Sequence, residues 1–91
     1  MSDPLVPLRE RFRARLIDDL ERLRGLRAST GKEAELRVLA HNLAGAAGTF
    51  GYPALSAVAV TVDDRHASGQ RPTEAELDAL EAAIASVIAP V

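Results

Sequence analysis

The sequence contains no cysteine, and only three aromatic residues and one methionine occur among its 91 residues. The lack of cysteine excludes a disulfide framework, a thiolate zinc site and a thiol nucleophile. With so few aromatic side chains, the core has to be built from leucine, valine, isoleucine and alanine, a composition that suits close-packed helices. Hydrophobic residues make up 47% of the chain, enough for one modest core, so a single domain over residues 1–91 is expected.

Long hydrophobic runs are also missing. No segment approaches the roughly 18 apolar residues of a membrane span, and the N-terminal region has no unbroken apolar stretch typical of a signal peptide. A cytoplasmic protein that does not bind membranes is therefore expected.

The formal net charge of -2 is unevenly distributed, because nine of the eleven basic residues lie in the first 37 positions. Acidic residues are interleaved with these arginines. A solvated helix face with local ion pairs, such as Asp18 with Arg22, is therefore expected, and a nucleic-acid-binding surface is the alternative.

Apolar residues recur every three or four positions in four segments, which is the spacing of amphipathic helices. Helices are expected at about residues 5–27, 31–49, 53–68 and 74–89. Thr30 and Glu33 have the spacing of a capping box before the second segment, and Thr73 and Glu76 repeat it before the fourth. Four helices with short connections predict an all-α fold, an antiparallel up-down-up-down four-helix bundle.

His41 lies on the second expected helix, about 140° around the axis from its apolar stripe, so its side chain should point towards solvent. Residues three and four positions later project back over its turn, and these are Ala44 and Gly45. Gly48 extends the same strip. Each glycine inside a helix costs about 0.5 to 1 kcal/mol relative to alanine. A need for open space around the exposed imidazole would explain why glycine occurs at these two positions. Close approach of another helix is the alternative explanation.

An exposed imidazole with cleared flanks suits nucleophilic attack on a group brought by a bulky partner. General-base catalysis would instead need a substrate pocket and a partner group. No serine or carboxylate is in helical contact with His41, and Arg37, four residues earlier, is the nearest charged group. The two histidines form no metal-binding pair, so no metal site is expected. His66, near the end of the third helix, is expected to be a packed side chain.

The segment from Ala40 to Gly51 resembles the histidine phosphotransfer (HPt) domains of bacterial phosphorelays. The shared motif is a histidine followed by a small residue at the fourth position and glycines at the seventh and tenth, here His41, Gly45, Gly48 and Gly51. The family's next helix has a leucine, an apolar residue and an acidic residue where this chain has Leu55, Val62 and Asp63. The first and last helical segments are also similar.

The resemblance implies that His41 accepts a phosphoryl group from an aspartyl phosphate on a receiver domain and passes it to another receiver. Receiver domains of response regulators and hybrid histidine kinases are then the expected partners, and Gly45 makes room for the phosphoryl group. Mg²⁺ and the acid–base machinery belong to the receiver. The chain would thus be a phosphocarrier without a cofactor of its own, not an enzyme, and a monomer is expected.

Ala44 departs from the family pattern, which usually has a lysine whose ammonium can neutralise phosphoryl charge. Arg37 lies on the turn over which the imidazole leans, so it is the candidate replacement cation. A degenerate bundle that binds receivers without being phosphorylated is one alternative. A helical nucleic-acid-binding module that uses the Arg-rich first helix is another, but no aromatic platform or recognition-helix pattern accompanies those arginines.

Small apolar side chains that lie off the core stripes are expected near His41. They are Val38 on the second helix and Ala57 and Val60 on the third. Exposed apolar groups beside a reactive residue favour a docking surface for a protein. These three residues are therefore the expected contacts of a receiver domain.

Overall fold

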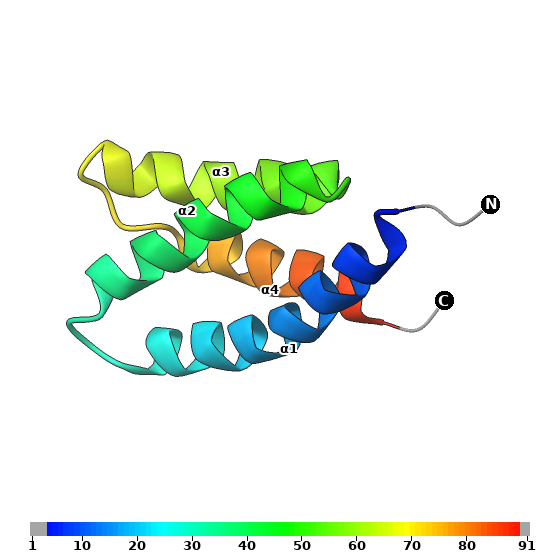
Figure 1. Cartoon of the computed structure of the whole chain (residues 1–91). Coiled ribbons are helices and arrows are strands. Elements are labelled where there is room, and N and C mark those ends of the chain that lie inside the picture. Colours follow the sequence, from blue (N-terminus) through cyan, green and yellow to red (C-terminus); the bar gives the residue numbers. More distant parts are fainter. Residues whose placement is uncertain (1–3, 90–91) are drawn as a thin grey trace.

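The computed structural model describes residues 4–89, in which the chain forms four helices and no strand (Figure 1). They are α1 (Val6–Ala28), α2 (Glu33–Thr49), α3 (Pro53–Ala67) and α4 (Glu74–Ile88). Each helix begins and ends within two residues of its expected range. The prediction of an all-α four-helix bundle is confirmed.

Successive helices run in opposite directions, and each packs against the two that neighbour it (Figure 1). The contact between α2 and α3 is the most extensive, whereas that between α1 and α2 is the least. Within residues 4–89, the backbones of the diagonal pairs, α2 with α4 and α1 with α3, do not approach each other closely. The side of the bundle that α2 and α3 form together is therefore its most closely packed one.

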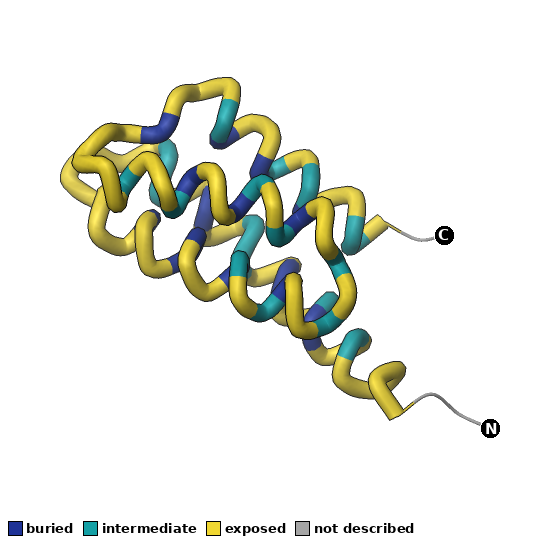
Figure 2. Tube along the Cα trace, turned by 90° about the horizontal axis from the view of Figure 1, so that it is seen from above, coloured by how far each residue is buried: buried dark blue, intermediate teal, exposed yellow. Residues whose placement is uncertain are grey.

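The core runs along the inner sides of all four helices (Figure 2). It consists of leucines with one phenylalanine, one valine, one isoleucine and three fully buried alanines, Ala40, Ala47 and Ala59. Small side chains let helix backbones approach closely, which is how a chain with few aromatic residues fills its interior. The three aromatic rings gather in one place, because Phe12 lies 5.2 Å from Phe50 and 5.7 Å from Tyr52 between ring centroids.

The start of α2 differs from the expectation. Lys32 is the N-cap and makes no side-chain cap hydrogen bond, so Glu33 is the first residue of the helix and not the third. Gly31 adopts a φ of 76°, a left-handed conformation that favours glycine. This turn leaves Thr30 two residues ahead of the N-cap, where its hydroxyl cannot serve the first turn. The prediction of a capping box at Thr30 was wrong.

The predicted capping box at the start of α4 is confirmed. The Glu76 N–H donates to the Thr73 hydroxyl at 3.1 Å, and the Thr73 N–H donates to a Glu76 carboxylate oxygen at 2.9 Å. This backbone hydrogen bond, together with the guanidinium of Arg65, lowers the pKa of Glu76. Because Arg65 lies on α3, the same carboxylate caps α4 and ties it to α3.

Two arginines of α1 form ion pairs with carboxylates of α4. Arg27 pairs with Glu74, Asp78 and Glu81 on α4, and Arg24 also pairs with Glu81. The expected local pair of Asp18 with Arg22 does not form within the described chain. Arg15 pairs with Asp19 instead, at 3.4 Å.

These α1 contacts bear on the nucleic-acid alternative. Arg24 and Arg27 are engaged with carboxylates of α4, which leaves fewer arginines of α1 to neutralise phosphates along a nucleic-acid strand. In the part of the chain that the structure describes, no helix combines the length and the apolarity needed to cross a bilayer.

Candidate functional site

His41 lies in the middle of α2, and 73% of its side chain is exposed. The buried residues of the same helix, among them Ala40 and Leu43, line the opposite face. The structure therefore shows His41 pointing outward, as helical phase predicts. An imidazole in this position can be reached by a second protein without any rearrangement of the bundle.

A carboxylate from the neighbouring helix orients the imidazole. The Nδ1 atom of His41 lies 3.0 Å from Oδ2 of Asp63 on α3, whose side chain is 22% exposed. Since an ionised carboxylate can only accept, the neutral imidazole donates the hydrogen on Nδ1, and the lone pair resides on Nε2. Nε2 makes no hydrogen bond with any residue from 4 to 89. The imidazole thus presents a nucleophilic nitrogen to solvent.

The sequence of α2 alone does not predict this contact, because Asp63 follows His41 by 22 residues and belongs to another helix. The antiparallel packing of α3 against α2 brings the two side chains together. The one sequence signal for Asp63 was its place in the family pattern of the third helix. Nothing in the periodicity of α3 alone indicates that this carboxylate faces a histidine.

Gly45 lies one turn after His41 and borders open space, since a Cβ placed on it would meet no atom within 4 Å. Packing within the bundle therefore does not require glycine at this position. Gly48 is different, because a Cβ there would lie 3.4 Å from the hydroxyl oxygen of Ser56 on α3. That hydroxyl donates to the carbonyl oxygen of Ala44 at 2.8 Å. A Cβ at Gly48 would thus make ordinary van der Waals contact with α3, whereas Gly45 clears the surface beside His41.

Gly51 ends α2. Its φ is 86°, and the N–H of the next residue, Tyr52, donates to the carbonyl of Ala47 at 2.8 Å. A second hydrogen bond runs from the Gly51 N–H to the Gly48 carbonyl at 3.4 Å. This pair of bonds around a left-handed residue is a Schellman motif. The last glycine of the motif is therefore explained by the turn into α3.

The remaining predicted site residues lie around His41 in different ways. Ala44 is half-buried and packs against the core. Arg37 is exposed and makes no ion pair or hydrogen bond with residues 4–89. Val38 and Val60 are exposed large hydrophobic side chains, at 55% and 41%, and Ala57 is exposed as well. We use the term His41 face for the surface formed by these side chains together with His41, Gly45 and Asp63.

A groove of about 620 Å³ adjoins the N-terminal half of α2. Arg37 and Val38 line it from α2, and His66 lines it from α3. His66 is half-buried, as expected for a packed side chain, and both of its ring nitrogens are buried without a hydrogen-bond partner. The position of His66 does not expose a nitrogen to an incoming protein, in contrast to that of His41.

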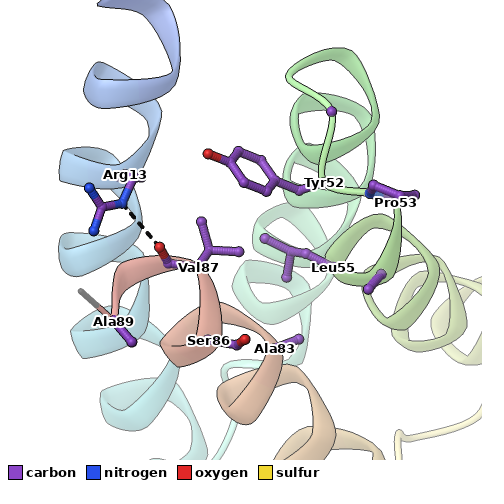
Figure 3. A pocket seen from close by; sticks show the side chains of 10 residues that line it. Arg13, Tyr52, Pro53, Leu55, Ala83, Ser86, Val87 and Ala89 are labelled. Atoms are coloured by element: carbon purple, nitrogen blue, oxygen red, sulfur yellow. Dashed lines mark hydrogen bonds between the residues drawn. The ribbon is translucent and has the colours of Figure 1, made fainter. Parts of the chain in front are cut away.

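A second hollow, of about 500 Å³, lies where the C-terminal end of α4 meets the start of α3 (Figure 3). Tyr52, Leu55 and Val87 line it, and the guanidinium of Arg13 donates to the carbonyl oxygens of Val87 and Ile88. No histidine or carboxylate lines this hollow. Among residues 4–89, no group of three or more histidine, aspartate or glutamate side chains is placed to hold a metal ion.

The fold and this site define a class of protein: a helical bundle that presents an exposed, carboxylate-oriented histidine beside exposed apolar side chains. A comparison with protein families matches the Hpt domain over residues 7–89, and the chain belongs to this family. Hpt domains serve histidine phosphotransfer in phosphorelays, where they interact with receiver domains and act as phosphocarriers. Neither a search of curated proteins nor a search of solved structures gives a match.

Proposed function

We propose that this Hpt domain accepts a phosphoryl group on Nε2 of His41 from the aspartyl phosphate of one receiver domain and passes it to an aspartate of another. The observation that carries the proposal is the state of the two ring nitrogens. Nδ1 is bound to Asp63 at 3.0 Å, whereas Nε2 faces solvent on a side chain that is 73% exposed. A nucleophile whose lone pair points outward can attack a phosphorus atom carried by a docked protein.

The surroundings of His41 indicate which groups this chain would supply and which the receiver would supply. Asp63 holds the ring, and no other side chain of residues 4–89 forms a hydrogen bond or ion pair with His41. Mg²⁺ and the groups that activate the aspartyl phosphate would therefore come from the receiver, and the chain would need no cofactor of its own. Open space beside Gly45 would admit the phosphoryl group together with the surface that delivers it.

The test is a transfer assay with a radiolabelled receiver phosphate. The wild-type chain should take up a label that acid removes and base does not, and a second, unphosphorylated receiver should then remove it from the chain. Analysis of the labelled peptide should place the phosphate on His41. Binding of the receiver without transfer of label would contradict the proposal and support a degenerate domain.

Arg37 is proposed to supply the positive charge that the family lysine provides elsewhere. Ala44, at the lysine position, ends in a half-buried methyl group, whereas Arg37 is exposed one turn before His41 and has no competing partner within the described chain. Replacement of Arg37 by alanine should slow acceptance of the phosphoryl group by about three- to tenfold, because a charge-assisted contact is lost. Rate measurements with Arg11→Ala, which removes an exposed arginine from α1, supply the control. Unchanged transfer rate and phosphohistidine lifetime in Arg37→Ala would rule out this role.

Val38, Ala57 and Val60 are proposed to contact the receiver. Replacement of Val60 by aspartate should weaken receiver binding and slow transfer by roughly tenfold, because a charge would be desolvated at an apolar contact. The matched control is Ile17→Asp, since Ile17 is also an exposed large hydrophobic side chain but lies on α1, outside the His41 face. Equal losses for the two variants would show that this face does not dock the receiver.

A further inference from the structure

We propose that Asp63 keeps a proton on Nδ1 of His41 throughout phosphoryl transfer, and that it thereby makes the phosphohistidine of this chain a short-lived intermediate instead of a store of phosphate. The inference rests on the proposed function of His41. It starts from the 3.0 Å contact between Nδ1 and the Asp63 carboxylate, which comes from a side chain that is mostly shielded from water. A carboxylate in this position affects both the acceptance and the release of the phosphoryl group.

Acceptance of the phosphoryl group needs no proton movement. The lone pair of Nε2 forms the N–P bond while the bond between phosphorus and the aspartyl oxygen of the receiver breaks, and the receiver carboxylate leaves with the electron pair. The ring of His41 then carries a positive charge, since Nδ1 still bears its hydrogen. The Asp63 carboxylate remains ionised and stabilises this charge across the hydrogen bond.

Release of the phosphoryl group depends on the same proton. When an oxygen of the next receiver aspartate attacks phosphorus, the electrons of the N–P bond return to Nε2. If Nδ1 is protonated, the leaving group is neutral imidazole. If Nδ1 has lost its proton, the leaving group is an imidazolate anion, which leaves far more slowly. Asp63 therefore favours rapid departure, both to a receiver and to water.

Among residues 4–89, Asp63 is the one charged side chain that contacts His41. Ala44 places a methyl group at the position of the family lysine, so the turn that follows His41 contributes no cation. The other charged or titratable side chains of this region are Arg37 on α2 and Asp64 and His66 on α3. No hydrogen bond or ion pair within residues 4–89 connects α1 or α4 to His41. Asp63 is thus the group in direct contact with Nδ1.

The test compares phosphohistidine lifetimes after chemical labelling with phosphoramidate, which requires no receiver. Once the reagent is removed, loss of phosphate from the wild type and from Asp63→Asn is followed between about pH 5 and 9. The wild type should keep its fast breakdown to a higher pH than the variant, because an opposite charge at this distance favours the protonated ring. Above roughly pH 7.5 the phosphate on Asp63→Asn should last about tenfold longer, and the two proteins should converge near pH 5.

Asp64→Asn is the matched control, since it removes the same charge from the neighbouring position and should behave as wild type. Identical pH profiles for wild type and Asp63→Asn would overturn the inference. Nitrogen NMR of the unphosphorylated proteins is the second measurement, with the Nδ1–H tautomer expected in the wild type and a larger share of Nε2–H in Asp63→Asn. If Asp63→Asn takes up no label, lifetimes cannot be compared and the NMR measurement decides. An Nε2–H tautomer in the wild type would then overturn the inference. Failure of receivers to label the wild type would instead contradict the proposed function.

Discussion

Replacement of His41 by glutamine is expected to abolish acid-labile phosphorylation of this chain and to leave the free energy of unfolding within about 0.5 kcal/mol of the wild type. An amide has no nucleophilic lone pair on nitrogen, so no N–P bond can form at this position. Stability should hardly change, because 73% of the side chain is exposed and its partner Asp63 keeps access to water. Binding of a receiver should persist, since the apolar side chains of the His41 face remain.

The measurement combines the transfer assay with chemical denaturation and with a binding isotherm. His66→Gln is the control, because it changes the second histidine of the chain, whose ring nitrogens are buried and unable to meet a docked phosphate. Labelling should continue in that variant. Label that persists on His41→Gln and disappears from His66→Gln would reverse the roles assigned to the two histidines.

Replacement of Leu43 by alanine should have the largest effect on the fold. The side chain is 0% exposed and lies on the inner side of the helix that carries His41. Removal of a buried leucine side chain costs roughly 2 to 5 kcal/mol, because apolar contacts are lost and a cavity remains. In a domain of this size the melting temperature should fall by roughly 8 to 40 °C, at about 4 to 8 °C per kcal/mol.

Val38→Ala is the comparison for Leu43→Ala, because it lies on the same helix and is 55% exposed. It should change the unfolding free energy by less than about 0.5 kcal/mol, and its effect should appear in receiver binding. Chemical denaturation of both variants measures the difference. Similar destabilisation by the two substitutions would contradict the division of α2 into a core face and a His41 face.

Local patterns predicted the helices and their buried faces well, because both depend on residues that lie within a few positions of one another. The periodicity of α2 was enough to orient His41, and the capping box of Thr73 and Glu76 appeared where its spacing indicated. The equally spaced pair of Thr30 and Glu33 failed. A single positive φ at Gly31 moved the helix start, and no pattern of side-chain types reveals that angle.

Contacts between helices could not be read in the same way. The pairing of Arg24 and Arg27 with α4, in place of local pairs along α1, depends on how two distant segments align. The contact that a Cβ at Gly48 would make with Ser56 depends on the register between α2 and α3. Both contacts require the tertiary structure, because helical periodicity states which face is apolar but not which residues of two faces meet.

The sequence by itself determined that this chain is a four-helix bundle with His41 on its surface, since hydrophobic spacing sets both the helices and their outward sides. It also carried the motif by which the Hpt family is identified. The tertiary structure alone decided that Asp63 binds Nδ1 and leaves Nε2 exposed. That choice of nitrogen is a property of two packed helices, because neither helix contains both the imidazole and the carboxylate that orients it.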